Sequence, residues 1–303
     1  MLRRTILALS RDPRIVRWMR RYGMRLGAGR FVAGETLDEC VRVLRRLNEM
    51  GFVTNTTLLG EDVDNAAAAE RVVDEYLTVL DRLAQERLRT NLSVKLTHLG
   101  LDLGEEVAVT DVARLVLRAA GHGQFLRIDM EESRRVEATL RIYRRLRSAG
   151  YTNVGTVLQA YLYRTERDLE ALLPLRPNLR LVKGAYLEPP DVAFPRKADV
   201  DRNLLRLIVR MLSEGGYTAI ATHDDRIIER AIEFIDAHRI PGDRYEFQML
   251  YGVRPQLQRA LVARGYRVLV ATPFGADWYP YFMRRLAERP ANVLFFLRSL
   301  IRR

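Results

Sequence analysis

Near the C-terminus, Tyr281, Arg284, Arg285 and Glu288 recur at a spacing that places them on one face of a helix. Such a face presents a phenol, two guanidinium groups and a carboxylate. Two adjacent guanidinium groups repel each other unless an anion lies between them, and a carboxylate held by paired hydrogen bonds suits their geometry. A surface helix with an ordinary Arg–Glu pair has the same spacing. The pattern therefore indicates a site for a small anion but does not establish one.

The lysines are a second chemical signal, because the chain otherwise uses arginine. Lysine and arginine number 50, and only Lys95, Lys183 and Lys197 are lysines. A general bias toward arginine explains the composition simply. A position that nevertheless has lysine indicates a need for a compact ammonium group in place of a planar guanidinium group. Because Lys95 and Lys183 lie in strand-like runs, we expect Lys95 to join Arg284 and Arg285 in binding the anion.

Polar residues also lie at or near the ends of several apolar runs. They are Lys95, Asp129, Glu131, Gln159, Lys183, Tyr186, Thr222, His223 and Gln248. If the runs are parallel strands of a closed barrel, their C-terminal ends meet at one face, where the active sites of such barrels lie. We expect these side chains to converge there.

Short β-type runs alternate with longer helical stretches, which predicts parallel strands joined by crossover helices. The expected strands are 31–34, 51–59, 92–96, 125–129, 154–161, 179–186, 218–222, 245–250 and 267–271. The helices between them are expected around 37–47, 64–88, 109–119, 131–148, 165–173, 198–213, 225–237 and 254–263, with closing helices after them. About eight such units predict an α/β fold of the (β/α)8 TIM-barrel type, with a doubly wound sheet as the alternative.

Composition narrows the possible classes. The 303 residues are 48% hydrophobic, which excludes disorder, and no apolar run approaches the roughly 20 residues that span a bilayer. A single cysteine, Cys40, excludes a disulfide framework and favours a reducing, cytoplasmic setting. No nucleotide-binding glycine motif, metal signature or nucleophile elbow is present, and Asp129 with Glu131 is weak evidence for a cation. We expect no metal.

The net charge is +12, yet the arginines alternate with glutamates along helices, so we expect no nucleic-acid partner. Residues 1–30 carry nine arginines and one acid, Asp12. We interpret them as a basic helical arm before a barrel domain of residues 31–303. A transit peptide and a peripheral contact with an anionic membrane at the inner surface remain alternatives.

Five motifs together resemble the proline dehydrogenases, above all the single-function bacterial enzymes. They are Leu92-Ser93-Val94-Lys95-Leu96, Arg127-Ile128-Asp129-Met130-Glu131, Leu181-Val182-Lys183-Gly184-Ala185-Tyr186, Glu246-Phe247-Gln248-Met249-Leu250 and Tyr281-x-x-Arg284-Arg285-x-x-Glu288. The resemblance implies a distorted (β/α)8 barrel that binds FAD. It also implies oxidation of L-proline to Δ1-pyrroline-5-carboxylate, with hydride transfer to flavin N5 and electrons passed to a quinone.

The resemblance also implies roles for individual residues. Asp129 and Arg180 would act at the reacting atoms, with Arg180 near flavin N5. The substrate would be bound by Lys95, Tyr186, Leu250, Tyr281, Arg284 and Arg285. The cofactor would be surrounded by Met130, Gln159, Arg180, Lys183, Gly184, Ala185, Thr222, His223 and Glu288, the last also holding the arginine face in place.

One position departs from the family pattern. The family often has a tyrosine two residues before the proline of the loop that leads to the last helix, and this chain has Ala271 before Pro273. Loss of the phenol favours a roomier site, so a flavoenzyme acting on hydroxyproline or another cyclic or N-substituted amino acid is one alternative. A lyase that forms a Schiff base on Lys183, and a basic protein without enzymatic activity that binds membranes or nucleic acids, are two others.

Overall fold

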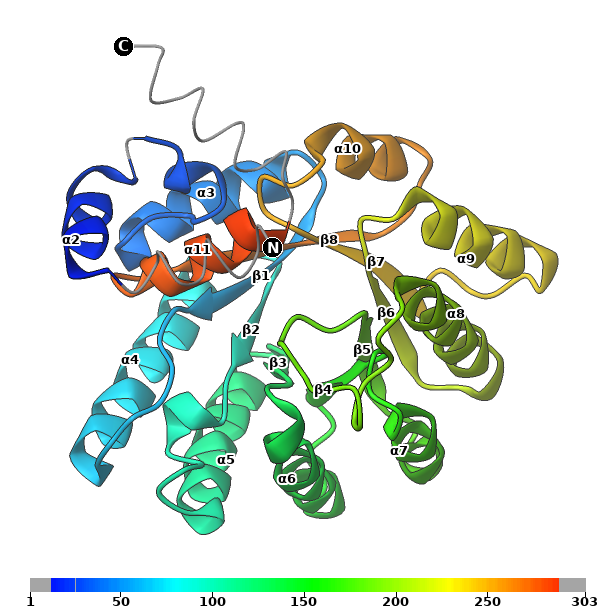
Figure 1. Cartoon of the computed structure of the whole chain (residues 1–303), viewed down its shortest axis with the longest axis horizontal. Helices are drawn as coiled ribbons and strands as arrows, with labels where there is room; N and C mark the ends of the chain where they lie inside the picture. Colours follow the sequence, from blue (N-terminus) through cyan, green and yellow to red (C-terminus); the bar gives the residue numbers. More distant parts are fainter. Residues whose placement is uncertain (1–11, 25, 289–303) are drawn as a thin grey trace.

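Eight parallel strands form a closed barrel in the computed structural model, which describes residues 12–24 and 26–288 (Figure 1). Each strand pairs with its neighbours in chain order, and β8 closes the barrel on β1 through a register that sets Asn55 opposite Ala271. The strands are β1 (Val53–Leu58), β2 (Thr90–Val94), β3 (Leu126–Ile128), β4 (Val154–Gln159), β5 (Asn178–Val182), β6 (Tyr217–Ala221), β7 (Tyr245–Leu250) and β8 (Val268–Phe274). The predicted TIM barrel is confirmed.

Helices connect successive strands on the outside of the barrel (Figure 1). The α-helices are α2 (Pro13–Tyr22), α3 (Leu37–Glu49), α4 (Ala66–Gln85), α5 (Glu105–Gly121), α6 (Val136–Ser148), α7 (Thr165–Leu172), α8 (Lys197–Glu214), α9 (Asp225–Ala237), α10 (Pro255–Ala263) and α11 (Trp278–Glu288). The short 3-10 helices are η1 (Ala28–Arg30), η2 (Thr97–Leu99), η3 (Ser133–Arg135) and η4 (Leu173–Leu175).

Local sequence explains where several helices begin. Thr36 and Glu39 form a capping box at the start of α3, each side chain accepting a hydrogen bond from the backbone N–H of the other. Asn65 caps α4 by accepting from the backbone of Ala68 at 2.8 Å. Because these caps satisfy N–H groups that a helix leaves without partners, they fix the residue at which each of the two helices begins.

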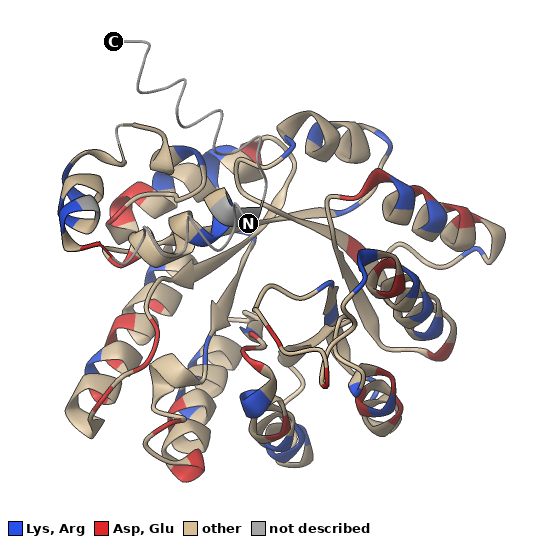
Figure 2. Cartoon of the chain, viewed as in Figure 1, with Lys and Arg blue, Asp and Glu red and all other residues tan. Residues whose placement is uncertain are grey.

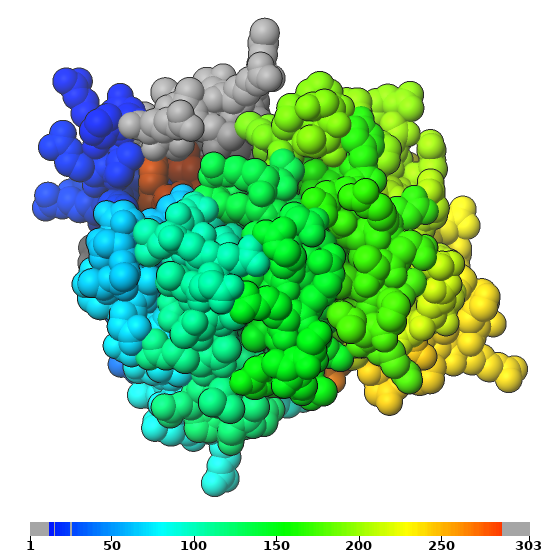
Figure 3. Space-filling view, turned by 90° about the horizontal axis from the view of Figure 1, so that it is seen from below, coloured from blue at the N-terminus to red at the C-terminus, as the bar shows by residue number. Residues whose placement is uncertain are grey.

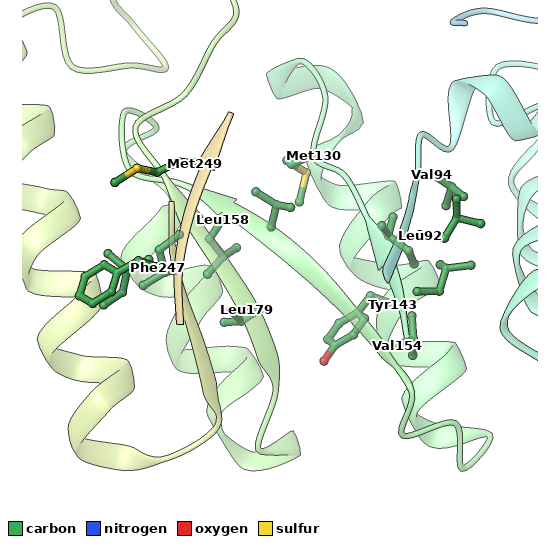
Figure 4. Packing of buried hydrophobic residues seen from close by; sticks show 14 of the residues in the cluster. Leu92, Val94, Met130, Tyr143, Val154, Leu158, Leu179, Phe247 and Met249 are labelled. Carbon is green, nitrogen blue, oxygen red and sulfur yellow. The ribbon is translucent and has the colours of Figure 1, made fainter. Parts of the chain in front are cut away.

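The main hydrophobic core lies between the strands and the surrounding helices. Figure 4 shows part of it, where Leu92, Val154 and Leu179 of the strands pack near Tyr143 of α6. Side chains alternate along each strand, so this face of the sheet is apolar and the other face points into the barrel. The apolar face holds the strands in place and leaves the interior face available for polar residues.

The strand predicted at residues 31–34 is wrong. These residues are buried, but only single hydrogen bonds connect them to the end of β8, from the backbone N–H of Ala33 to Pro273 and from that of Gly275 to Gly34. Gly34 has a φ of 130°, which ends the extended conformation. The first barrel strand is therefore the second expected run, and the ninth run is β8.

The N-terminal helix α2 packs against α11, beside which it lies in Figure 3. A second hydrophobic cluster joins the two, with Met19, Phe31, Trp278 and Phe282 among its buried residues. Within the predicted arm, the structure has α2 and the short helix η1, whereas residues 1–11 and residue 25 fall outside the described part. The arm as a separate unit and its boundary at residue 30 stay predictions. None of the described helices combines the length and apolar character needed to cross a bilayer.

Ion pairs connect neighbouring helices around the outside, where blue and red residues alternate (Figure 2). In each pair, an arginine at or near one helix meets a carboxylate of the helix before it. The pairs include Arg114–Glu70 (2.8 Å), Arg141–Glu105 (2.7 Å), Arg164–Glu137, Arg206–Glu166 (3.1 Å) and Arg264–Glu229 (2.9 Å). We call this set of pairs the outer ring. These arginines therefore have carboxylate partners within the chain.

Candidate active site

A cavity of about 700 Å³ opens at the C-terminal ends of the barrel strands. Glu131, which was also expected at this opening, does not line the cavity, but every residue to which the resemblance assigns a role lines it, except Glu288. These residues are Lys95, Asp129, Met130, Gln159, Arg180, Lys183, Gly184, Ala185, Tyr186, Thr222, His223, Leu250, Tyr281, Arg284 and Arg285. Glu288 ends α11, and its side chain lies outside the described part of the chain.

The strand ends account for this convergence. Lys95 directly follows β2, Asp129 follows β3, and Lys183 follows β5. Gln159 and Leu250 are the last residues of β4 and β7. Since all strands of the barrel run in one direction, residues at their C-terminal ends meet around one opening. Helix α11 then brings its three predicted residues to that opening from outside the sheet.

A carboxylate that sequence reasoning missed lies within the predicted anion site. Glu61, in the loop after β1, accepts a hydrogen bond from Arg284 Nη2 at 2.6 Å and forms a short ion pair with Lys95. Burial raises the pKa of Glu61, but the charges of Lys95 and Arg284 outweigh it and bring the pKa below its usual value. Lys95 and Arg284 thus already bind one carboxylate, which shows that their geometry suits this group.

Arg180 is the centre of a hydrogen-bond network below this pair. Its Nη1 donates to Asp129 Oδ1 at 2.6 Å and its Nε donates to Gln248 Oε1 at 2.6 Å. Its Nη2 lies 3.3 Å from Asn55 Oδ1 and 3.4 Å from Ser93 Oγ. The guanidinium group is therefore held on every side, and its plane is fixed inside the barrel.

All three lysines of the chain line the cavity. Lys183 Nζ contacts Asp201 Oδ1 at 2.6 Å and Asp224 Oδ2 at 2.8 Å, and Lys197 contacts both carboxylates from the rim. Burial raises the pKa of each aspartate, but the lysines outweigh it and leave both pKa values below the usual range. Lys197 was not predicted, although its residue type was the available signal.

Glu131 supports the segment that carries Lys95. It is 2% exposed and accepts from Thr97 at both the backbone N–H (3.1 Å) and the side-chain hydroxyl (2.7 Å). Burial raises its pKa, and the two hydrogen bonds from Thr97 oppose that rise. Both carboxylate oxygens of Glu131 are thus engaged in holding a turn. Nearby, burial and the charges of Glu131 and Glu61 raise the pKa of the Tyr186 phenol.

A sequence profile of the proline dehydrogenase family matches residues 40–298. The chain belongs to the proline dehydrogenase family. It is therefore an oxidoreductase, and the resemblance inferred from the five motifs is confirmed.

The relatives of the chain include single-function and bifunctional members of the proline dehydrogenase family. Proline dehydrogenase 1 of Bacillus subtilis (strain 168) is 44% identical over 303 residues, the whole of both chains. The proline dehydrogenase of Deinococcus radiodurans is 41% identical over 99% of this chain and 98% of its own. The bifunctional protein PutA of Escherichia coli (strain K12) is 28% identical over 90% of this chain and 24% of PutA.

The fold also matches solved structures. Proline utilization A from Bdellovibrio bacteriovorus superimposes with a TM-score of 0.81 at 24% identity, covering 86% of this chain and 32% of that one. At this identity the match supports the barrel fold and not the roles of individual residues.

Proposed function

We propose that the chain oxidises L-proline to Δ1-pyrroline-5-carboxylate in the cavity at the barrel opening, with FAD as the electron acceptor. The observation that carries the proposal is that Lys95, Arg284 and Arg285 line one cavity together with the residues expected to hold the cofactor. Two of these cations already bind the Glu61 carboxylate, so their geometry is suited to the carboxylate of an amino acid.

The cavity residues fit a flavin. A volume of about 700 Å³ suits a cofactor-sized ligand with its substrate. Gln159 is 3% exposed, and its Oε1 is buried without a hydrogen-bond partner among the residues that the structure describes. A buried acceptor of this kind favours a ligand that donates to it. We infer that FAD is held by Met130, Gln159, Arg180, Lys183, Gly184, Ala185, Thr222 and His223. The role expected for Glu288 stays a prediction, because its side chain lies outside the described part of the chain.

The reaction removes a hydride from the ring carbon beside nitrogen and a proton from the nitrogen, which leaves a C=N bond. FAD, when bound, accepts the hydride at N5. The amine must be neutral to release the hydride, and the positive charges of Lys95, Arg284 and Arg285 lower the pKa of an adjacent amine. Tyr186, Leu250 and Tyr281 line the same cavity and would pack on the ring. Binding at both ends orients the reacting carbon.

Purification of the chain tests this function directly. We expect yellow protein with a flavin absorption spectrum and dye reduction that depends on added proline. Colourless protein that gives no proline-dependent reduction, even after FAD is added, would count against the proposal.

Hydroxyproline is the second candidate substrate, and Ala271 favours it. Ala271 lines the cavity on β8, opposite Asn55 of β1 and Leu250 of β7. An alanine leaves space that a tyrosine would fill, and space near the ring suits a substrate with an added hydroxyl. We expect Ala271→Tyr to lower kcat/KM for hydroxyproline more than for proline. Equal effects on the two substrates would remove the argument for hydroxyproline.

The Schiff-base lyase is not supported. Two carboxylates contact the Lys183 ammonium group and are shared with Lys197, so its surroundings differ from the apolar pocket that activates a Schiff-base lysine.

We further propose that electrons pass to a quinone while the enzyme contacts an anionic membrane from the cytoplasm. Helix α2 supports this proposal, because it presents Arg14, Arg17 and Arg21 to solvent, with Trp18 45% and Tyr22 39% exposed. Basic and aromatic side chains together suit an anionic bilayer surface. Sedimentation with vesicles of phosphatidylglycerol, but not of phosphatidylcholine, is the expected result. Equal sedimentation, or none, would contradict the proposal.

A further inference from the structure

A buried carboxylate lies beneath the cavity, outside the set of residues that line it. Glu246 is on β7, two residues before Gln248, and is 1% exposed. Its Oε1 accepts from Gln248 Nε2 at 2.6 Å, and its Oε2 accepts from Arg267 Nε at 3.1 Å, at the start of β8. Burying a charged group is costly, so Glu246 must be held by strong partners.

The hydrogen bonds form a continuous path from this carboxylate to the cavity. Gln248 donates through Nε2 to Glu246 and accepts through Oε1 from Arg180 Nε at 2.6 Å. Arg180 then donates through Nη1 to Asp129. Each step therefore has a defined donor and a defined acceptor.

The chemistry of the two end groups determines which way the amide lies. An ionised carboxylate only accepts hydrogen bonds, and a guanidinium group only donates them. The Gln248 amide must therefore turn its NH₂ toward Glu246 and its oxygen toward Arg180. If the amide were reversed, its NH₂ would face the donating guanidinium group of Arg180 at one end, and its oxygen would face the accepting carboxylate of Glu246 at the other.

We propose that Glu246 is a positioning residue, which orients the Gln248 amide and through it holds Arg180 in the pose that faces Asp129 and the cavity. It touches neither the cavity nor any reacting atom. Its importance for catalysis rests on the function proposed above, in which Arg180 lies beside the flavin. A small displacement of such a group lowers the rate without weakening the distant carboxylate clamp.

Glu246→Gln tests the proposal with little change of shape. A glutamine at position 246 removes the carboxylate that anchors the Gln248 NH₂, so the amide is then oriented by Arg180 alone and is less firmly held in place. We expect kcat for proline to fall about 10- to 100-fold while KM changes less than about threefold. We also expect a shifted flavin absorption spectrum and, in a crystal structure, loss of the hydrogen bond between Arg180 Nε and the amide oxygen. An unchanged kcat together with an unchanged Arg180 would overturn the proposal.

The double variant E246Q/Q248E offers a rescue, because it exchanges the amide and the carboxylate between the two positions. The amide, now at position 246, would donate to the carboxylate at position 248 and accept from Arg267. That carboxylate would in turn accept from Arg180, so every group keeps a partner and the net charge is preserved. We expect kcat to return to within about threefold of the wild type. If the double variant folds with the stability of the wild type and recovers no activity, the proposed role of Glu246 is wrong.

Arg267→Gln is the matched control, because it removes the other partner of Glu246 and leaves the amide contact in place. We expect lower thermal stability with kcat within about threefold of the wild type. A loss of kcat equal to that of E246Q would show that Glu246 serves only to stabilise the fold.

Gln248→Met decides the question should E246Q fail to fold. This variant removes the acceptor of Arg180 and retains the Glu246–Arg267 pair, so kcat must fall with KM nearly unchanged; a normal kcat would overturn the proposal. Wild-type protein without proline-dependent dye reduction would count against the proposed function. Even then, the E246Q crystal structure would test the role of Glu246: a displaced Arg180 would support that role, and an unchanged Arg180 would contradict it.

Discussion

The barrel opening and the outer ring both contain ion pairs between basic residues and carboxylates, but the two sets of pairs differ in their exposure to water. At the opening, Arg284 and Lys95 share the Glu61 carboxylate, and the Lys95 side chain is 13% exposed. On the outer ring, Arg114 pairs with Glu70 while 38% and 55% of the two side chains are exposed. Water competes for the ring pairs and screens them, whereas the pairs at the opening lie in a partly desolvated site.

This difference in exposure indicates that the burial of an ion pair, and not the types of its residues, determines how strongly the pair affects function. A surface pair contributes on the order of 0–1 kcal/mol to stability, but removal of one partner from a desolvated pair leaves an uncompensated charge and costs several times more. The chain can therefore carry 50 basic residues and depend for its chemistry on a few of them.

The largest contrast is expected from removing one arginine at each place. Arg284→Met leaves Glu61 and Lys95 without their guanidinium partner and removes a hydrogen-bonding group for the substrate carboxylate. We expect kcat/KM for proline to fall about 200-fold, equivalent to about 3 kcal/mol. The control Arg264→Met, on the outer ring, is expected to retain wild-type steady-state kinetics. Similar losses in both variants would erase the distinction between the two regions.

The second prediction concerns a buried histidine near the barrel opening. His98 lies buried under the segment of Lys95, and burial together with the charge of Lys95 lowers its pKa to about 4. The native state keeps this ring neutral while the unfolded chain takes up a proton below about pH 6.5, so acid favours unfolding. We expect the free energy of unfolding to fall by about 2–3 kcal/mol between pH 6.5 and pH 4 on account of His98.

Urea denaturation across this pH range measures the effect of His98. His98→Gln should remove most of the slope. A slope that this variant leaves unchanged would place the acid-sensitive group elsewhere in the chain.

A smaller effect is expected from exchanging the two cationic residue types. Lys95→Arg keeps the positive charge but replaces the compact ammonium group that contacts Glu61 with a larger, planar guanidinium group. Because the larger group alters the geometry of the site, we expect kcat/KM for proline to fall about tenfold. Arg114→Lys is the reciprocal exchange on the outer ring and should leave activity unchanged. Full activity of the Lys95→Arg variant would mean that the opening needs only the charge.

The smallest effect is expected on the outer ring itself. Arg114→Met removes the ion pair with Glu70, and we expect the free energy of unfolding to fall only slightly, and by less at high salt, because water screens this exposed pair. A double-mutant cycle with Glu70→Gln isolates the pair. A coupling of several kcal/mol would show that the ring is as important for stability as the opening is for function.

Much of the site was predictable because the signals were local. The spacing of Tyr281, Arg284 and Arg285 predicted a shared helical face, and all three line the cavity. Lys95 and Lys183 carried the signal of a rare residue type at the end of an apolar run. These features depend only on helical and strand periodicity, which short stretches of sequence reveal.

Other parts could not be found in this way. Glu61 lies in an ordinary loop, and the chain has 38 acidic residues, so nothing in the sequence distinguishes it. Only the closed barrel brings it to Lys95 and Arg284. Residues 31–34 have the composition of a strand, yet Gly34 and the packing of α11 place them in a turn beside the barrel.

The sequence by itself determined the alternation of strands and helices, the strand ends that carry polar residues, and the family to which the chain belongs. Only the tertiary structure decided which polar groups meet, as when Gln248 reaches Arg180 from 68 positions away along the chain. The physical reason is that periodicity sets the direction of a side chain within its own element. Closure of the barrel sets the distance between elements, and that distance determines which charges become partners.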